Sequence, residues 1–249
     1  MQRILVLGGT TEASALAAAL AGRGADVVLS YAGRTRAPRA QPVPVRIGGF
    51  GGVQGLADYL RGHGITHLID ATHPFAATIS RNAVAAAQIT GTPLIALTRP
   101  PWQPGPGDDW HHVPDIAAAV TALSGPAQRV MLALGRMQLP EFAAQPQHHY
   151  LLRLVDPPDQ PPPLPRHQVI VDRGPFTTAG DMALMRDHGT RIIVAKNAGG
   201  TGADAKLAAA RALRLPVILI DRPALPPRRQ AFSVAEVLAW LDHPADLGV

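Results

Sequence analysis

A short segment near the start of the chain carries residue types that bind a phosphate group. It lies between an apolar run over residues 3–7 and an Ala- and Leu-rich segment typical of a helix. Glycine lets the backbone come close to a ligand, and a helix N-terminus offers amide donors and a positive dipole. The segment predicts a dinucleotide-binding loop, although Thr10 and Ala13 replace the second and third glycines of G-x-G-x-x-G; a tight turn capped by threonine is the alternative. Its residues are Gly8, Gly9, Thr10, Thr11 and Glu12.

An arginine follows the second apolar run, residues 26–30, where NAD-binding proteins usually have an acid for the ribose hydroxyls. Arginine suits a 2′-phosphate instead, so the pattern predicts NADPH rather than NADH. The residues expected to contact the cofactor here are Ser30, Gly33 and Arg34. Because Arg36 and Arg39 follow closely, a solvated basic loop is the alternative.

A third motif follows the apolar run that ends at residue 69. Its four residues are Thr72, His73, Pro74 and Phe75. Ligands bind at the carboxyl edge of open parallel sheets, so we expect this motif to line the nicotinamide end of the site. His73 is a candidate proton donor, since its ordinary pKa lies near neutrality. In the alternative, Pro74 starts the next helix and His73 caps it.

The second half of the chain places basic and amide side chains at the ends of predicted strands. Lysine and arginine there, with open backbone amides, predict a carboxylate or phosphate site. The candidates are Arg136, Lys196, Asn197, Gly200, Thr201 and Arg222, with Lys206 on the helix that follows; Arg173 and Arg99, the latter from the first half of the chain, are weaker candidates of the same kind. Exposed lysines in solvated loops are the alternative, since most lysines lie at the surface.

These motifs need parallel strands that alternate with helices. In the first part we expect strands at 3–7, 26–30, 66–69 and 93–98, and helices at 11–21, 53–61 and 76–90. In the second part we expect strands at 129–134, 149–155, 169–171, 191–195 and 217–220, and helices at 115–123, 179–188, 203–213 and 234–241. The Pro- and Gly-rich stretch 99–107 continues neither a helix nor a central strand. The sequence therefore predicts an α/β protein of two doubly wound, Rossmann-like lobes with a cleft between them, residues 1–99 for NADPH and residues 108–249 for the substrate.

Composition excludes several classes of protein. The chain has no cysteine, which removes disulfides, thiolate metal sites and cysteine nucleophiles. No apolar stretch is long enough to span a bilayer and no signal peptide is evident, so we expect a cytoplasmic protein without a membrane partner. The net charge is +5, but the arginines are not interleaved with aromatics as in nucleic-acid-binding motifs. The ten histidines lack metal-ligand spacing, so we expect no metal.

Several segments taken together resemble the precorrin-6A reductase family from about residue 3 to residue 222. They are the opening Leu-Gly-Gly-Thr-Thr-Glu, Asp70-Ala-Thr-His-Pro-Phe-Ala76, Leu134-Gly-Arg136, Gly174-Pro-Phe176, Ala195-Lys-Asn-Ala-Gly-Gly200 and Asp221-Arg-Pro223. Ala195 and Ala198 depart from the family, which often has serine there. The resemblance implies hydride transfer from NADPH to a double bond of precorrin-6A in cobalamin biosynthesis. It also implies that the cations of the second lobe bind the carboxylates of this macrocycle.

Two other functions remain open. Another NADP-linked reductase could use the same scaffold for a smaller carbonyl substrate, but no tyrosine has a lysine four residues further on. A non-catalytic, two-lobed sensor that binds a nucleotide or a carboxylate is the second alternative.

Overall fold

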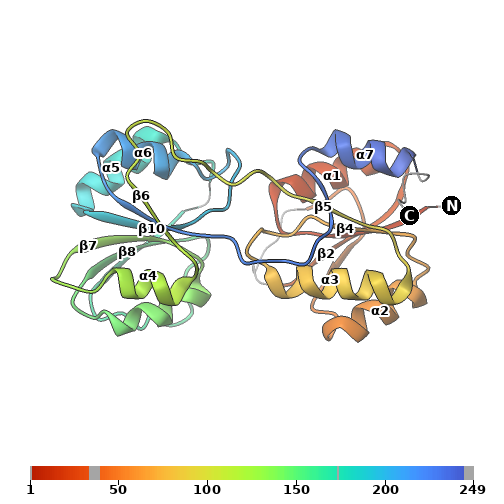
Figure 1. Cartoon of the computed structure of the whole chain (residues 1–249), viewed down its shortest axis with the longest axis horizontal. Coiled ribbons are helices and arrows are strands. Elements are labelled where there is room, and N and C mark those ends of the chain that lie inside the picture. The colour runs from red at the N-terminus through yellow and green to blue at the C-terminus, as the bar shows by residue number, and fades with distance from the viewer. Residues whose placement is uncertain (1, 34–39, 173, 244–249) are drawn as a thin grey trace. The chain divides into compact units, whose positions relative to one another are not determined.

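The computed structural model describes residues 2–33, 40–172 and 174–243. The chain forms two compact units, one of Met1–Pro100 with Ala224–Val249 and one of Pro101–Pro223. The chain therefore passes from the first unit into the second and returns to the first. Each unit contains a parallel sheet covered by helices, which confirms the predicted fold class (Figure 1).

In unit 1 the described residues form a six-stranded parallel sheet with the order β12-β5-β4-β1-β2-β3. Its strands are β1 (Arg3–Leu7), β2 (Asp26–Tyr31), β3 (Val45–Ile47), β4 (His67–Asp70), β5 (Leu94–Leu97) and β12 (Arg229–Ala231). Its helices are α1 (Thr11–Gly22), α2 (Gly52–Gly62), α3 (Ala77–Thr90) and α7 (Val234–Asp242). Figure 1 shows α1 and α7 on one face of the sheet and α2 and α3 on the other. Central strands with both faces covered must be apolar throughout, and β1 is buried from Ile4 to Leu7.

In unit 2 the described residues form a second six-stranded parallel sheet, with the order β6-β11-β10-β7-β8-β9. Its strands are β6 (Trp110–Val113), β7 (Arg129–Ala133), β8 (His149–Leu154), β9 (His167–Val171), β10 (Ile192–Lys196) and β11 (Val217–Ile220). Its helices are α4 (Ile116–Ala122), the 3-10 helix η1 (Arg136–Ala144), α5 (Thr178–His188) and α6 (Ala205–Leu213). Figure 1 shows α5 and α6 on one face of this sheet and α4 on the other.

Both sheets share one arrangement around their centre. β1 lies between β2 and β4, and β7 lies between β8 and β10, so the strand order reverses direction at each of these central strands. In such sheets the loops after the two strands at the reversal diverge to opposite faces, and ligands bind between them. The carboxyl ends of β1 and β4 define this point in unit 1, and those of β7 and β10 define it in unit 2.

The prediction that residues 108–249 form the second lobe is wrong for the C-terminal segment. Strand β12 pairs in parallel with β5, and Val237, Trp240 and Leu241 of α7 are buried in the core of unit 1. The prediction failed because periodicity locates elements along the chain but does not show which sheet an element joins. The elements β3, β6, β12 and η1 were not predicted either. The three strands are short and carry polar or exposed residues, as expected at or near the edge of a sheet.

Among the described residues, no helix combines the length and apolar character needed to cross a membrane. In the same part of the chain, no group of three or more His, Asp or Glu side chains is placed to hold a metal ion.

Candidate functional site

Two motifs that are far apart in the sequence meet at the carboxyl edge of unit 1. Leu7 at the end of β1 pairs with Asp70 at the end of β4. In the loop after β1, the Thr10 hydroxyl caps α1 by accepting from the Ala13 amide at 3.1 Å. The same hydroxyl donates to the Ala71 carbonyl at 2.9 Å, which ties the first loop to the loop after β4. The predicted dinucleotide loop and the Thr72–Phe75 motif therefore belong to one site.

The two glycines of the first loop are needed for different reasons. A Cβ atom at Gly8 would lie 2.7 Å from Leu29 Cδ1, so this glycine lets β1 pack against β2. Gly9 has φ of +128°, which side-chain-bearing residues rarely adopt, and no heavy atom lies within 4 Å of the position of a Cβ. The backbone at Gly9 is thus exposed to open space at the N-terminus of α1. This arrangement fits a dinucleotide phosphate.

An ion pair lies beside this loop. Arg99, just after β5, approaches the Glu12 carboxylate with N–O distances of 2.9 and 3.2 Å. The side chains are 16% and 29% exposed, respectively. Burial on its own raises the pKa of the Glu12 carboxyl, but its own backbone N–H and the Arg99 charge outweigh it, so the pKa lies below its ordinary value. Both residues line a small cavity together with Thr10, Thr72 and Thr98.

The buried Asp70 carboxylate forms hydrogen bonds that hold the Thr72–Phe75 loop in place. Asp70 Oδ1 accepts from the Thr72 amide at 3.1 Å and the Thr72 hydroxyl at 2.6 Å, while Oδ2 accepts from the Ser80 hydroxyl at 2.6 Å. Arg228 completes the network with an ion pair of 3.0 Å to Oδ2. Because Arg228 comes from the returning C-terminal segment, sequence analysis did not find it. The sequence gives one indication of such a partner: Asp70 is an acid at the end of an apolar strand, and a buried acid requires a partner.

His73 also holds the loop in shape. Its Nδ1 accepts a hydrogen bond from the Phe75 amide at 3.2 Å. Since Nδ1 accepts, the proton of the neutral ring lies on Nε2. The alternative in which Pro74 starts the next helix and His73 caps it is wrong, because α3 begins at Ala77 with Ala76 as its N-cap and no side-chain cap hydrogen bond.

Two of the residues predicted to contact the cofactor lie at or just after the end of β2. Ser30 is buried, and its carbonyl accepts from the Gly8 amide at 2.9 Å. Gly33 has φ of +75°, which favours glycine. Arg34, Arg36 and Arg39 lie outside the described residues. A cation that was not predicted, Arg46 of β3, stacks on the Phe50 ring at 3.8 Å and reaches the Ser30 hydroxyl at 3.4 Å.

In unit 2 several predicted ligands hold the protein's own loops. Asn197 is 4% exposed, and its side chain accepts from the Trp102 amide at 2.8 Å and donates to the Trp102 carbonyl at 3.1 Å. Arg222 donates to the carbonyls of Asn197 and Ala198, both at 2.9 Å. Lys206 is 5% exposed, donates to the Ala203 carbonyl and lies 5.0 Å from the Trp102 ring. These three side chains shape the loop after β10.

The remaining predicted ligands of unit 2 follow the two strands at its reversal of strand order. Arg136 follows β7, where its side chain is 46% exposed and 3.8 Å from Asp159. Lys196 is the last residue of β10. Gly200 has φ of +73°, and its carbonyl accepts from Trp102 Nε1 at 2.7 Å, while Thr201 is exposed. Arg173 lies outside the described residues. Tertiary structure thus brings Arg136 and Lys196 to the corresponding edge of unit 2.

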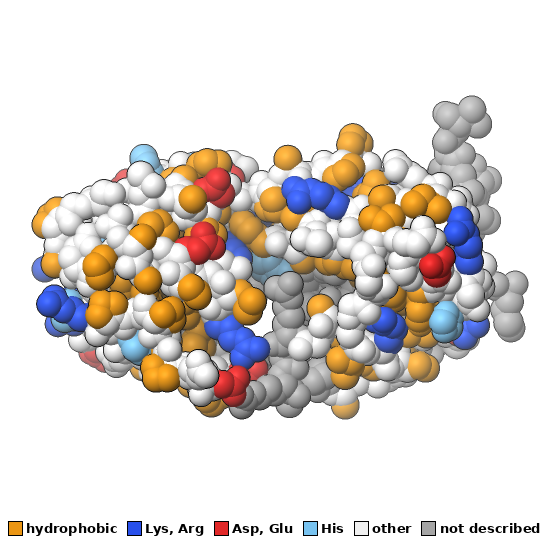
Figure 2. Space-filling model, turned by 90° about the horizontal axis from the view of Figure 1, so that it is seen from below, with side chains coloured by type: hydrophobic (Ala, Val, Ile, Leu, Met, Phe, Trp, Pro, Cys, Tyr) orange, Lys and Arg blue, Asp and Glu red, His pale blue; other side chains and the backbone are white. Residues whose placement is uncertain are grey.

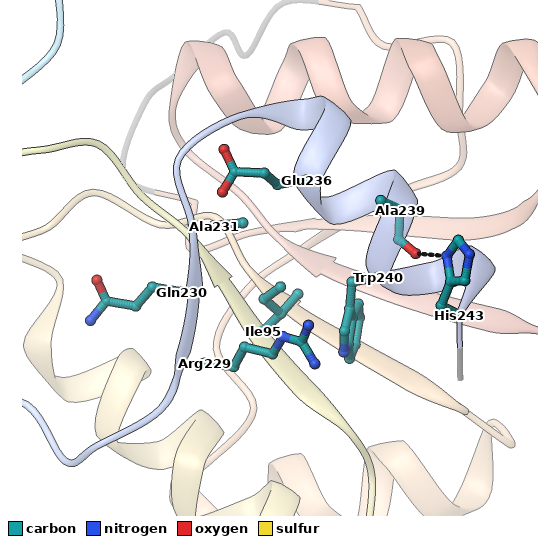
Figure 3. A pocket seen from close by; sticks show the side chains of 8 residues that line it. All are labelled: Ile95, Arg229, Gln230, Ala231, Glu236, Ala239, Trp240 and His243. Carbon is teal, nitrogen blue, oxygen red and sulfur yellow. Dashed lines mark hydrogen bonds between the residues drawn. The ribbon is translucent and has the colours of Figure 1, made fainter. Parts of the chain in front are cut away.

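A larger cavity of unit 1 lies away from these motifs. It has a volume of about 270 Å³, and its lining includes Ile95 of β5, Arg229 of β12 and Trp240 of α7 (Figure 3). None of the residues predicted from sequence lines it. Figure 2 shows Lys and Arg side chains in separate groups on the face in view, with acidic and hydrophobic side chains between them.

The fold and the unit 1 edge define a class of protein: a two-unit α/β protein with a glycine-containing loop between strand and helix at the reversal of strand order. The family model of precorrin-6x reductase CbiJ/CobK matches residues 3–242. The chain belongs to this family.

Individual relatives agree with the family assignment. A precorrin-6A reductase of Rhodobacter capsulatus is 60% identical over 246 residues and covers 98% of both chains. A precorrin-6A reductase of Rhodococcus erythropolis is 49% identical and covers 97% of this chain and 98% of its own. A solved structure described as CobK precorrin-6A reductase superposes with a TM-score of 0.94 at 57% identity and covers 98% of both chains.

Proposed function

We propose that this protein is a precorrin-6A reductase, an oxidoreductase that transfers hydride from NADPH to a double bond of the precorrin-6A macrocycle in cobalamin biosynthesis. The observation that carries the proposal is the family match over residues 3–242, supported by 60% identity to a relative of that name. A reductase of this kind uses a nicotinamide cofactor, and a cytoplasmic location suits it. We expect neither a membrane nor a nucleic-acid partner.

Unit 1 is the proposed cofactor unit. The open backbone at Gly9 and the N-terminus of α1, capped by Thr10, suit the pyrophosphate. The end of β2, with Ser30, Gly33 and Arg34, is the proposed position of the adenosine half. We propose NADPH rather than NADH because arginine stands where an acid would bind the ribose hydroxyls.

Unit 2 is the proposed substrate unit. Arg136 and Lys196 follow the central strands β7 and β10, and both cations can donate to carboxylates. Asn197, Lys206 and Arg222 are proposed to act on the substrate by holding the loop after β10, which carries Gly200 and Thr201. Direct contact of these three side chains with the substrate stays a prediction.

Catalysis rests mainly on orientation. NADPH, when bound, supplies the hydride, and the protein holds donor and acceptor in a reactive geometry. Thr72, Pro74 and Phe75 are proposed to line the nicotinamide end of the site, where the Asp70 network keeps their loop rigid. His73 Nε2 is the proposed proton donor for the carbon next to the one that accepts the hydride.

One assay tests the reaction and the choice of cofactor. The purified protein is mixed with NADPH and precorrin-6A while the nicotinamide absorbance and the macrocycle spectrum are followed together. We expect equal loss of NADPH and of precorrin-6A. In the same assay Arg34→Ala should raise the KM for NADPH by about tenfold or more but leave that for NADH nearly unchanged, because one charge-assisted contact is worth about 1.5–3 kcal/mol.

Other outcomes favour the alternatives. NADPH binding without turnover of the tetrapyrrole would support a non-catalytic sensor. Oxidation of NADPH only with small carbonyl compounds would support a different reductase. An equal loss of NADPH and NADH affinity in Arg34→Ala would contradict the 2′-phosphate assignment alone.

A further inference from the structure

The small cavity beside Glu12 and Arg99 lies on one particular side of the proposed cofactor site. Its lining comes from the start of α1, from the loop after β4 (Thr72 and Pro74) and from the end of β5 (Thr98 and Arg99). No residue of β2 lines it. The cavity therefore lies on the β4–β5 side of the reversal of strand order.

This position selects one half of a dinucleotide. In doubly wound sheets the first ribose lies at the end of the second strand and the pyrophosphate lies at the first loop. The dinucleotide crosses the sheet at the reversal of strand order, so its other half lies over the strands on the opposite side. In unit 1 these are β4 and β5. The cavity is thus placed at the nicotinamide half, on the basis of the proposed function.

The Glu12–Arg99 pair offers both kinds of hydrogen-bonding group to such a ligand. An ionised carboxylate only accepts hydrogen bonds, and a guanidinium only donates them. The two partly buried side chains, with an N–O distance of 2.9 Å, present an acceptor and a donor together without net charge. A primary carboxamide is the complement of this pair, because it carries one carbonyl acceptor and one NH₂ donor.

We propose that the Glu12–Arg99 pair binds the carboxamide of the nicotinamide ring, with Arg99 donating to the carbonyl oxygen and Glu12 accepting from the NH₂ group. Holding the carboxamide fixes the rotation of the ring about its bond to the ribose. The pair is therefore a specificity-determining element that sets which face of the ring is presented. The Arg99 charge also neutralises the Glu12 carboxylate in the first turn of α1, which would otherwise repel a phosphate bound at that helix end.

Binding calorimetry on the full-length protein tests this without turnover. Three ligands are compared: NADP⁺, its analogue with an acetyl group in place of the carboxamide, and 2′-phosphoadenosine diphosphoribose, which lacks the nicotinamide. The wild-type protein should bind NADP⁺ at least ~10-fold more tightly than the acetyl analogue, because a methyl group cannot donate a hydrogen bond to the Glu12 carboxylate. Glu12→Ala should abolish this preference, whereas Glu12→Gln should keep most of it.

Substitution of Arg99 distinguishes the loss of a contact with the nicotinamide from a loss of stability or of long-range charge. Arg99→Met should weaken both nicotinamide ligands by about tenfold or more and leave the affinity for the fragment without nicotinamide unchanged. Arg23→Met is the matched control, because Arg23 at the other end of α1 forms an exposed ion pair with Asp242 at 3.0 Å. We expect this variant to bind all three ligands like the wild type.

Two results would overturn the inference while the proposed function stands. One is an undiminished preference for NADP⁺ over the acetyl analogue in Glu12→Ala. The other is an equal loss of affinity for the fragment in Arg99→Met, which would point to stability or long-range charge. Failure of the wild-type protein to bind NADP⁺ at all would instead overturn the proposed function, and this inference with it.

Discussion

At the scale of the residue, the polar side chains of unit 2 show how one residue type can serve two purposes. Asn197 was predicted to meet a ligand because it follows a strand at the carboxyl edge, and Lys206 was predicted to do so from the helix after that loop. In the structure both are almost completely buried and bonded to backbone carbonyls. Burying a polar group without a partner is costly, so these bonds are needed for the loop to keep its shape. The spacing of motifs located the loop, but only contacts revealed what its side chains do.

His73 allows a test of proton donation at this scale. In His73→Asn, the Asn Oδ1 atom can replace Nδ1 as the acceptor of the Phe75 amide, which keeps the loop in place, but no titratable proton remains. We expect kcat to fall by about 10²-fold or more while the KM for NADPH changes by less than about threefold. Steady-state kinetics across the pH range checks this. A kcat close to that of the wild type would show that water supplies the proton.

At the scale of the element, the ends of β1 and β4 bring together the loops that sequence analysis treated separately. Parallel pairing of Leu7 with Asp70 places both loops at one edge, and the Thr10–Ala71 hydrogen bond joins them. The Asp70 carboxylate then ties the second loop to α3 through Ser80 and to the returning C-terminal segment through Arg228. The site therefore depends on three segments of unit 1.

The Asp70–Arg228 pair should make a large contribution that depends on both partners. The two side chains are 1% and 10% exposed, so removing one leaves the other charged and buried. We expect Asp70→Asn and Arg228→Met each to lower the free energy of unfolding by about 3 kcal/mol, measured by urea denaturation. The double variant should lose at least about 1 kcal/mol less than the sum of the two. Additive losses would show that the two residues act independently.

At the scale of the whole molecule, the two units have the same strand order around their central strands. The sixth strand of each sheet, however, comes from a different place in the sequence. Both sheets have six described strands with a reversal of strand order at the centre. In unit 2 the sixth strand, β6, precedes the rest of its sheet in the sequence. In unit 1 the sixth strand, β12, arrives only after the whole of unit 2. Unit 1 is therefore complete only when the chain has returned to it.

Leu241 tests this division. It is 3% exposed and belongs to the core between α1, α7 and the sheet of unit 1. Leu241→Ala should lower the free energy of unfolding of unit 1 by about 2–5 kcal/mol, since it leaves a cavity. Hydrogen exchange should accelerate in β1 and β5 but not in β7 or β10, because each unit has its own core. Leu219→Ala in β11 is the matched variant, and we expect it to show the opposite pattern.

Most of the central elements are predictable from the sequence because the signals for them are local. The run over Arg3–Leu7 is apolar, Thr10 caps a helix, and Gly9 needs a positive φ; neighbouring residues are enough to determine each of these features. Short strands such as β3 and β12 carry too few apolar residues to produce a pattern. The loops after β1, β4, β7 and β10 could also be placed at carboxyl edges, because the same local signals locate the ends of these strands.

What the sequence by itself determined is therefore the parallel α/β class, the two-lobed organisation and the loops that carry the candidate site, together with the resemblance that the family match confirmed. Tertiary structure alone decided that the C-terminal segment joins unit 1. It also decided that Glu12 meets Arg99, 87 positions away, and that Asp70 meets Arg228. The physical reason is that secondary structure depends on neighbours along the chain, whereas the pairing of buried charges depends on which strands lie side by side in the folded sheet.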